Sequence, residues 1–296
     1  MKKKLLLLVN PVSGKGRVKP HLLGIIKVFS DADYATTVYV TRRSGDATAQ
    51  VEKFGKDYDV IVACGGDGTM NEVVTGALHI RYEGSIGFLP CGTTNDFASS
   101  LELPKSLVKA AELIAKSEAK ELDFGSFNRL RPFIYVAAFG AFTDVSYRTD
   151  QKLKNVFGHA AYISEGISRL VDLRKYNIKV TCDEDVYEGE YLFGAAANTF
   201  SLGGVIKVKE DEVDLKDGYH EVLLIRNPKT ATEFTQLSAA LLSGKFDSKS
   251  IQILRGKKIL FDCEEEIPWC VDGEFAGDFK HVEVNNLHER LRVFYS

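Results

Sequence analysis

The stretch Val60-Ile-Val-Ala-Cys-Gly65-Gly-Asp-Gly-Thr-Met-Asn-Glu72 carries the strongest structural signal in this chain. Its first five residues are apolar, which is typical of a strand that is covered on both faces. Three glycines and an aspartate follow, and the residues from Met70 onward predict a helix. The N–H groups and the dipole at a helix N-terminus attract anions, and glycines without Cβ atoms let a phosphate approach the backbone. This stretch therefore predicts a phosphate-binding turn.

The aspartate in this turn, Asp67, narrows the prediction. A carboxylate disfavours a bare anion, but it fits a turn in which Mg²⁺ lies between the carboxylate and the phosphates. Thr69 adds a hydroxyl to the same turn. The turn is not a Rossmann fingerprint, because Asn71 occupies the third glycine position, and Gly14-Lys15-Gly16 is not a Walker A loop, because no Ser or Thr follows its lysine. A plain tight turn is the alternative.

Strand-like and helix-like segments alternate through residues 1–122. Apolar or β-branched runs predict the strands, and helical spacing or helix-favouring composition predicts the helices. The expected strands are 5–9, 36–40, 60–64 and 86–89, and the expected helices are 20–30, 46–54, 70–78 and 107–116, with a short helix from residue 95. This alternation predicts an α/β domain with a mostly parallel, doubly wound sheet.

The loops that follow parallel strands line one crevice, so they add candidate ligands to the glycine turn. Asn10, Ser13 and Lys15 follow the first strand, Thr41 follows the second, and Thr93 follows the fourth. These side chains offer hydroxyl, amide and ammonium groups to a phosphate or a nucleotide. A glycine-rich turn is the alternative for the first loop, and helix capping is the alternative for Thr93 and Thr94.

Residues 123–296 have a different character. The expected strands are 133–139, 178–182, 187–197, 220–225, 257–261, 280–284 and 291–295, with helices near 162–173 and 230–242 and a hairpin turn at 183–185. Successive strands predict a mostly antiparallel β domain, a sandwich or flattened barrel. No Pro/Gly/Ser linker marks the boundary, so we expect two domains that share a cleft. Whether the strand near 291–296 returns to the first domain stays open.

Composition excludes several classes of protein. A formal net charge of -3 does not predict a nucleic-acid partner. The five cysteines are scattered without a CxxC, which argues against disulfides or a zinc site and for a reducing compartment. The apolar run Leu5–Val9 stops at Asn10, too soon for a signal peptide, and no stretch approaches the roughly 20 apolar residues of a membrane span. We expect a cytoplasmic protein.

Three loops carry a family resemblance. The segments Asn10-Pro-x-Ser-Gly14, Gly65-Gly-Asp-Gly-Thr-x-Asn-Glu72 and Gly92-Thr-x-Asn-Asp-Phe97 resemble the diacylglycerol-kinase catalytic domain that is shared with sphingosine kinases and bacterial lipid kinases. The resemblance continues at 198–204, 214–219 and 271–274. The Gly65 motif is shared with NAD kinases, whereas the Gly92 segment is more particular to lipid kinases.

The resemblance implies a fold, a reaction and two substrates. It implies an NAD kinase/phosphofructokinase-like first domain and a β-sandwich second domain that binds the lipid. It implies transfer of the γ-phosphate from ATP with Mg²⁺ to a lipid hydroxyl, with diacylglycerol as the leading acceptor and phosphatidic acid as the product. Because the chain is not expected to span the membrane, it would visit the inner membrane surface transiently, and a homodimer is left open.

Site residues follow from the resemblance position by position. It extends the ATP contacts to Pro11, Val12, Gly14, Gly65, Gly66, Gly68, Asn71 and Glu72. It implies that Asp272 or Glu274 accepts the proton of the lipid hydroxyl, with a slight preference for Asp272. It also implies a structural Mg²⁺ at Asp214, Asp217 and the Tyr219 backbone. An Asp-Gly hairpin turn is the alternative at 272–273, and a solvated acidic turn is the alternative at 214–219.

Other interpretations remain. Residues 203–205 and 208–210 depart from the family pattern, which leaves the acceptor open among diacylglycerol, a sphingoid base, a monoacylglycerol, phosphatidylglycerol and a polyprenol. An NAD kinase-like phosphotransferase is a second reading, and a non-catalytic nucleotide-binding module is a third. Asp67 and Asp272, both present, argue for catalysis.

Overall fold

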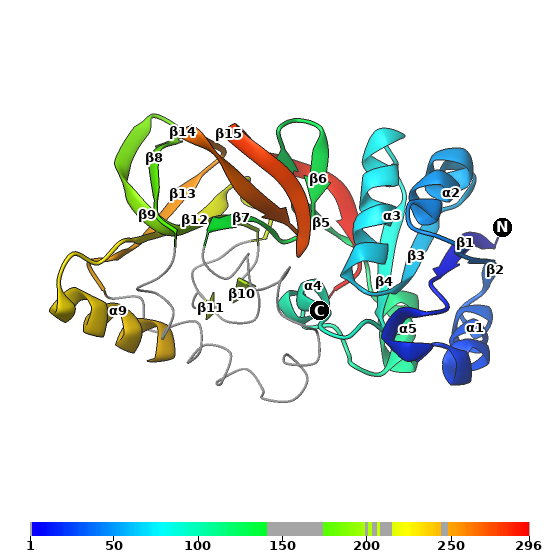
Figure 1. Cartoon of the computed structure of the whole chain (residues 1–296). Helices are drawn as coiled ribbons and strands as arrows, with labels where there is room; N and C mark the ends of the chain where they lie inside the picture. Colours follow the sequence, from blue (N-terminus) through cyan, green and yellow to red (C-terminus); the bar gives the residue numbers. More distant parts are fainter. Residues whose placement is uncertain are drawn as a thin grey trace. The chain divides into compact units, whose positions relative to one another are not determined.

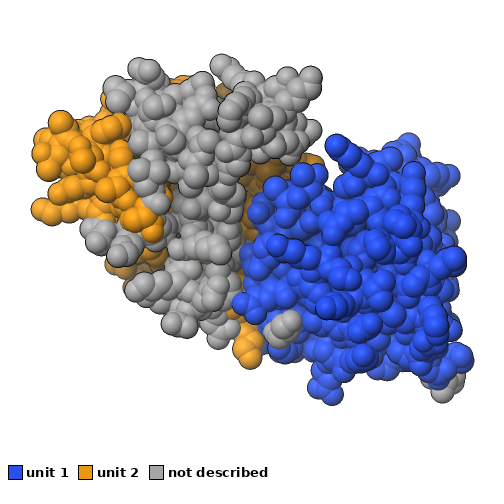
Figure 2. All heavy atoms as spheres, turned by 90° about the horizontal axis from the view of Figure 1, so that it is seen from below, with its two compact units in different colours: residues 1–124, 287–296 blue, residues 125–286 orange. Residues whose placement is uncertain are grey.

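The chain divides into two compact units (Figure 2). Unit 1 consists of Met1–Phe124 and Leu287–Ser296, and unit 2 consists of Gly125–Asn286. The structure is a computed structural model and describes residues 2–140, 174–198, 201–202, 206–207, 215–243 and 248–295. The sequence prediction placed the domain boundary after residue 122, two residues before the division in the structure.

A parallel sheet forms the centre of unit 1, with its strands in the order β15, β4, β3, β1, β2 (Figure 1). The strands are β1 Lys3–Val9, β2 Tyr34–Val40, β3 Val60–Gly65, β4 Ser85–Pro90 and the end of β15 Glu274–Val293. Arg292 and Val293 of β15 pair with Ser85 and Ile86, so the chain returns to this sheet at its C-terminal end. The apolar runs of β1 and β3 are buried because helices cover both faces.

Two pairs of helices cover this sheet (Figure 1). α1 (Leu22–Asp31) and α5 (Leu107–Lys116) lie on one face, where Phe29 and Ile114 pack in one core with Leu5, Leu7 and Val62. α2 (Asp46–Phe54) and α3 (Asp67–His79) lie on the other face. The bounds of α2 and α5 agree with the prediction. The doubly wound α/β fold predicted for this part of the chain is confirmed.

The start of α3 differs from the prediction by three residues. Gly66 has an extended backbone and its carbonyl accepts the N–H groups of Thr69, at 3.0 Å, and Met70, at 3.1 Å. The helix therefore begins at Asp67, inside the glycine turn, and its N-terminus follows β3 directly. A short helix, α4 (Asp96–Ser100), follows β4, and single 3₁₀ turns lie at Ser13–Lys15, Lys19–His21 and Gly55–Asp57.

Unit 2 is mainly antiparallel, as predicted. Its main strands lie in the order β13, β12, β9, β7, β14, β15, and β8 pairs with both β14 and β9. The elements are β5 Lys120–Phe127, β6 Arg131–Phe133, β7 Val136–Gly140, β8 Tyr176–Cys182, β9 Asp185–Ala197, β10 Ser201–Leu202, β11 Ile206–Lys207, β12 His220–Arg226, α9 Ala231–Ser243, β13 Ile251–Gly256 and β14 Lys258–Val271. Trp269, Phe139 and Phe261 pack against one another in its core.

Several strand predictions in this unit were wrong in detail. The expected strand 133–139 is interrupted at Ile134 and Tyr135, β14 and β15 are longer than predicted, and β5 and β13 were missed. The hairpin turn after Cys182 and the helix near 230–242 are confirmed. The helix expected near 162–173 lies outside the described residues. Within the described ranges, no helix is long and apolar enough to cross a membrane.

Candidate active site

The glycines of the Gly65 turn are needed mainly where loops meet. A Cβ on Gly65 would lie 2.3 Å from the Thr69 hydroxyl oxygen, and a Cβ on Gly92 would lie 2.6 Å from the Cα of Gly66. A Cβ on Gly68 would meet nothing within 4 Å. The sequence predicted that all three glycines leave the backbone open to a phosphate. Of the three, Gly68, at the N-terminus of α3, has open space where a Cβ would lie. Gly65 and Gly66 let this turn pack against its neighbours.

Asp67 holds the loop that follows β4. Its Oδ2 accepts the backbone N–H of Asp96 at 3.0 Å, and its Oδ1 accepts that of Phe97 at 3.2 Å. These N–H groups belong to the first turn of α4, so Asp67 caps a helix about 30 residues away in the sequence. The alternative that Thr93 or Thr94 caps this helix is not supported, because α4 has no side-chain cap at Asn95 and both threonines are exposed.

Thr69 connects the same turn to the loop after β1. Asn10 donates from Nδ2 to the Thr69 hydroxyl at 3.1 Å, and its Oδ1 accepts the N–H of Val12 at 3.2 Å. Gly14 has a left-handed backbone, and a Cβ there would lie 1.9 Å from the carbonyl oxygen of Cys91. The Asn10–Gly14 loop is therefore fastened both to the Gly65 turn and to the segment after β4.

Glu72 reaches the third neighbouring loop, which follows β2. Its carboxylate accepts the N–H groups of Gly45 at 2.8 Å and Ala47 at 3.1 Å. Thr41, in that loop, is buried and donates its hydroxyl to the Val9 carbonyl at 3.3 Å. Asn71 accepts the hydroxyl of Thr75 at 3.4 Å. The motif from Gly65 to Glu72 thus contacts all three loops that the sequence placed beside it.

Two buried thiols lie beneath these loops. The Sγ atoms of Cys64, at the end of β3, and Cys91, after β4, are 3.9 Å apart. The hydrogen bond from Cys64 lowers the pKa of Cys91, assisted by the Ser13 hydroxyl, while the same contact and burial raise the pKa of Cys64. All five cysteines are free and buried, as predicted for small apolar side chains.

The second acidic motif, in unit 2, forms a hairpin turn between β14 and β15. Asp272 and Gly273 both have left-handed backbones, as a tight hairpin turn requires. The Asp272 carboxylate accepts three consecutive N–H groups, from Ile134 at 2.8 Å and from Tyr135 and Val136 at 3.1 Å each. This explains the interruption between β6 and β7, because these N–H groups bond a side chain in place of a neighbouring strand.

Glu274 has a different environment. Its side chain is largely exposed, and its Oε2 lies 3.1 Å from a guanidinium nitrogen of Arg131. Asp272 is therefore held in place by backbone groups, whereas Glu274 is held by one surface ion pair.

Comparison with known proteins agrees with the fold of each unit. A family model described as the diacylglycerol kinase catalytic domain matches residues 4–127, and one described as the YegS C-terminal NAD kinase beta sandwich-like domain matches residues 136–294. The chain is 31% identical to a diacylglycerol kinase of Staphylococcus carnosus over 99% of this chain and 95% of that protein. It is 32% identical to a diacylglycerol kinase of Bacillus subtilis over 97% of this chain and 94% of that protein.

The chain belongs to the diacylglycerol kinase family. A solved diacylglycerol kinase structure from Bacillus anthracis shares the fold, with a TM-score of 0.78 at 24% identity over 99% of this chain and 97% of that one. The predicted family, fold class and enzyme class are confirmed: this is an ATP-dependent lipid kinase.

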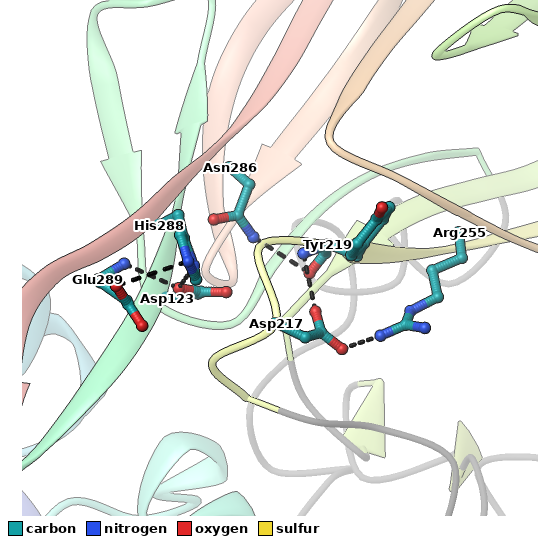
Figure 3. Close-up of polar contacts among 7 residues, drawn as sticks. All are labelled: Asp123, Asp217, Tyr219, Arg255, Asn286, His288 and Glu289. Atoms are coloured by element: carbon teal, nitrogen blue, oxygen red, sulfur yellow. Dashed lines mark hydrogen bonds and ion pairs between the residues drawn. The ribbon is translucent and has the colours of Figure 1, made fainter.

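Two residues of the predicted structural metal site, Asp217 and Tyr219, make contacts with other side chains of the kinase (Figure 3). Asp217 accepts the N–H of Tyr219 at 2.8 Å through one oxygen and pairs with Arg255 through the other. The Tyr219 carbonyl accepts the side-chain amide of Asn286 at 3.1 Å. Asp214 lies outside the described residues. No group of three metal-ligating side chains occurs in the described part of the chain.

Asp123 in β5 is a buried acid of the kinase that none of the sequence motifs indicated (Figure 3). Its Oδ1 accepts the Nδ1–H of His288 at 2.8 Å and the N–H of Glu289 at 2.9 Å, and its side chain is fully buried. An aspartate between Leu122 and Phe124 is the signal that was available, because an acid in an apolar strand needs partners. These bonds hold the end of β15 beside β5 within unit 1.

Proposed function

We propose that this lipid kinase transfers the γ-phosphate of ATP to the hydroxyl of diacylglycerol and so forms phosphatidic acid. The two relatives named as diacylglycerol kinases match the chain along almost its whole length, at 31% and 32% identity. Family membership supports the reaction class, and the shared name supports the acceptor.

The main support for an ATP site in unit 1 is the central position of the motif Gly65–Glu72. Asp67, Thr69 and Glu72 each contact a different loop of the predicted crevice. In this proposal the phosphates rest on the N-terminus of α3 at Gly68, on the Asn10–Gly14 loop, and beside Thr41 and Thr93. A helix N-terminus with an open glycine suits a phosphate, because N–H groups and the helix dipole face it.

Magnesium fits the oxygen-rich side of this turn. Mg²⁺ prefers oxygen ligands, and a carboxylate oxygen that accepts one N–H has a second lone pair. We therefore propose that Asp67 holds Mg²⁺, which would neutralise the phosphate charge during transfer. The structural Mg²⁺ at Asp214, Asp217 and the Tyr219 backbone stays a prediction, because Asp217 pairs with Arg255 and Asp214 lies outside the described residues.

Asp272 is the proposed proton acceptor. Three N–H groups fix its carboxylate, so it presents an oxygen in a constant orientation. Phosphoryl transfer depends mostly on positioning and charge neutralisation, which an oriented weak base satisfies. Glu274 is the alternative, with its carboxylate committed to Arg131 at the surface.

The cellular setting completes the proposal. The acceptor is a membrane lipid, so a cytoplasmic kinase would visit the inner membrane surface transiently and reach the lipid headgroup there. A homodimer belongs to the same proposal and is tested by sedimentation.

The test is transfer of labelled phosphate from Mg-ATP to acceptors in mixed micelles. Diacylglycerol, sphingosine, phosphatidylglycerol and an undecaprenol are offered separately, with NAD in parallel. The proposal predicts a labelled product that migrates with phosphatidic acid. Label in another lipid would replace the acceptor, and label in NAD alone would replace the reaction by that of an NAD kinase.

A further inference from the structure

Glu72 directs its carboxylate at a neighbouring loop. It lies on α3, and its two oxygens accept the N–H groups of Gly45 at 2.8 Å and Ala47 at 3.1 Å. The Ser44 hydroxyl lies 3.4 Å from Oε1, and the Thr48 hydroxyl donates to the backbone carbonyl of Glu72 at 2.8 Å. Within the described residues, the Glu72 carboxylate thus contacts the start of α2 and the two residues before it.

The start of α2 lacks an acceptor of its own. Gly45 precedes the helix with a left-handed backbone and has no side chain to cap it. Asp46, the first helical residue, is turned back into the loop, where it accepts the N–H of Arg42 at 2.9 Å and the Tyr39 hydroxyl at 3.1 Å. The N–H groups of the first turn need acceptors, and a negative charge is favourable there. Glu72 supplies both from another helix.

We propose that Glu72 is a positioning residue that holds the loop Thr41–Gly45 in its ATP-binding geometry, and that it does not contact the nucleotide. This inference rests on the proposed ATP site, because that loop carries Thr41. It differs from the direct ATP contact that the family resemblance implies for Glu72. The residue acts on ATP through Gly45 and Ala47, whose amides it fixes.

Loss of a positioning residue should weaken ATP binding without slowing the transfer step, whereas loss of a direct ligand could change both. Without its cap, the loop is less ordered before any ATP arrives, and ATP must order it on binding. The Kd and KM for ATP then rise by about threefold to thirtyfold, the range that corresponds to the loss of a helix cap. The kcat at saturating ATP and the KM for the lipid change little, because neither depends on ordering this loop again.

The experiment compares Glu72→Ala and Glu72→Gln with two controls. Glu52→Ala removes an exposed carboxylate of α2 that pairs with His79 and is remote from the loop. Thr48→Val removes the contact between α2 and the Glu72 carbonyl but leaves the carboxylate bonds. Amide hydrogen exchange is measured without ATP, and the Kd for ATP is measured without lipid.

We expect faster exchange of the Gly45 and Ala47 amides in Glu72→Ala, an intermediate effect in Glu72→Gln, which keeps one acceptor oxygen, and no change in either control. The Kd for ATP should rise in the same order. Unchanged exchange with a higher Kd would make Glu72 a direct ligand and overturn the proposal. Faster exchange with an unchanged Kd would overturn it as well, because the loop would then lie outside the ATP site. Since neither readout requires phosphorylation of a lipid, failure of the acceptor assignment is distinguished from failure of this inference.

Discussion

Asp46 in unit 1 and Glu221 in unit 2 are both buried carboxyl groups, yet their pKa values are shifted in opposite directions. The backbone N–H of Arg42 and the hydroxyl of Tyr39 lower the pKa of Asp46. Burial raises the pKa of Glu221 to about 7. Within the described part of the chain, Glu221 Oε2 has no hydrogen-bond partner, and Arg255 Nε is 3.8 Å from Oε1.

The difference shows that the pKa of an acid in this kinase is lowered where backbone and hydroxyl groups donate to it and is raised where burial is the largest influence. Asp67, Glu72 and Asp272 resemble Asp46 in that each accepts backbone N–H groups, although their donors lie in distant segments and that of Asp46 lies in its own loop. Such acids are fixed in orientation by the N–H groups that they accept. Glu221 is the opposite case. Substitutions of these acids test the difference between carboxylates that accept N–H groups and the buried Glu221.

Asp67→Ala should abolish phosphate transfer, because it removes the proposed Mg²⁺ ligand and the cap of α4. Asp67→Asn should be almost as inactive, although its amide oxygen still accepts an N–H. Both variants should remain folded, at a cost of about 1–3 kcal/mol in unfolding free energy for the N–H groups left without an acceptor. Turnover and thermal melts check this.

Asp59→Ala is the matched control for Asp67, because Asp59 also accepts a backbone N–H, from Lys4 at 2.7 Å, but at an exposed position. It should keep normal turnover. If Asp67→Asn also keeps most of its activity, Asp67 is a cap alone and its Mg²⁺ role is wrong.

Asp272→Asn should lower kcat by about 10²–10⁴, the usual span for loss of a general base. Glu274→Gln should change kcat by less than about fivefold, because it removes one exposed ion pair. Steady-state rates at saturating ATP and lipid compare the two variants. The opposite ranking would move the base to Glu274, and near-normal turnover in both would exclude this motif as the source of a base.

Glu221 predicts a pH dependence of stability. Its pKa rises from 4.5 in the unfolded chain to about 7 in the folded one, so the folded state retains a proton that the unfolded state has lost. The unfolding free energy therefore falls as pH rises from about 4.5 to about 7, by about 3 kcal/mol for this group, and is level above that.

Glu221→Gln should remove this part of the pH dependence and gain stability relative to the wild type at pH 8 but not at pH 4.5. Urea unfolding at both values measures the difference. Parallel pH profiles for the two proteins would show that Glu221 is neutralised by Arg255 and belongs with Asp46.

Asp46→Asn should have the smallest effect and the opposite sign with pH. The pKa of Asp46 is lowered, so its contribution to stability is present above its unfolded value of 3.8 and is lost as pH falls through the folded pKa. The variant should be less stable than the wild type at pH 7 and equal to it near pH 2. A constant difference across this range would mean that the amide loses packing and not charge.

Local signals explain what the sequence predicted well. The bounds of α2 were predicted from helical spacing and those of α5 from helix-favouring composition, and both signals lie within the segment itself. The start of α3 was missed because glycine disfavours a helix, and Gly66 and Gly68 lie at its first turn. β5 was missed because Asp123 and Gly125 are unusual in strands.

Long-range contacts explain what the sequence did not predict. The interruption at Ile134 and Tyr135 depends on Asp272, more than 130 residues later. The loops of the candidate site were predicted from strand order, but the partners of Asp67 and Glu72 were not, since they lie 25–30 residues away. A motif shows which residue types are present, whereas only the fold shows which amides they meet.

The central claim is that one motif assembles the ATP site from its neighbouring loops. The most direct test is a map of amide exchange with and without Mg²⁺ and a non-hydrolysable ATP analogue. We predict slower exchange in four segments, 10–16, 41–47, 65–72 and 92–97, with the strongest protection at the start of α3. Protection confined to other segments of unit 1, or protection of 65–72 without the three neighbouring loops, would contradict the claim.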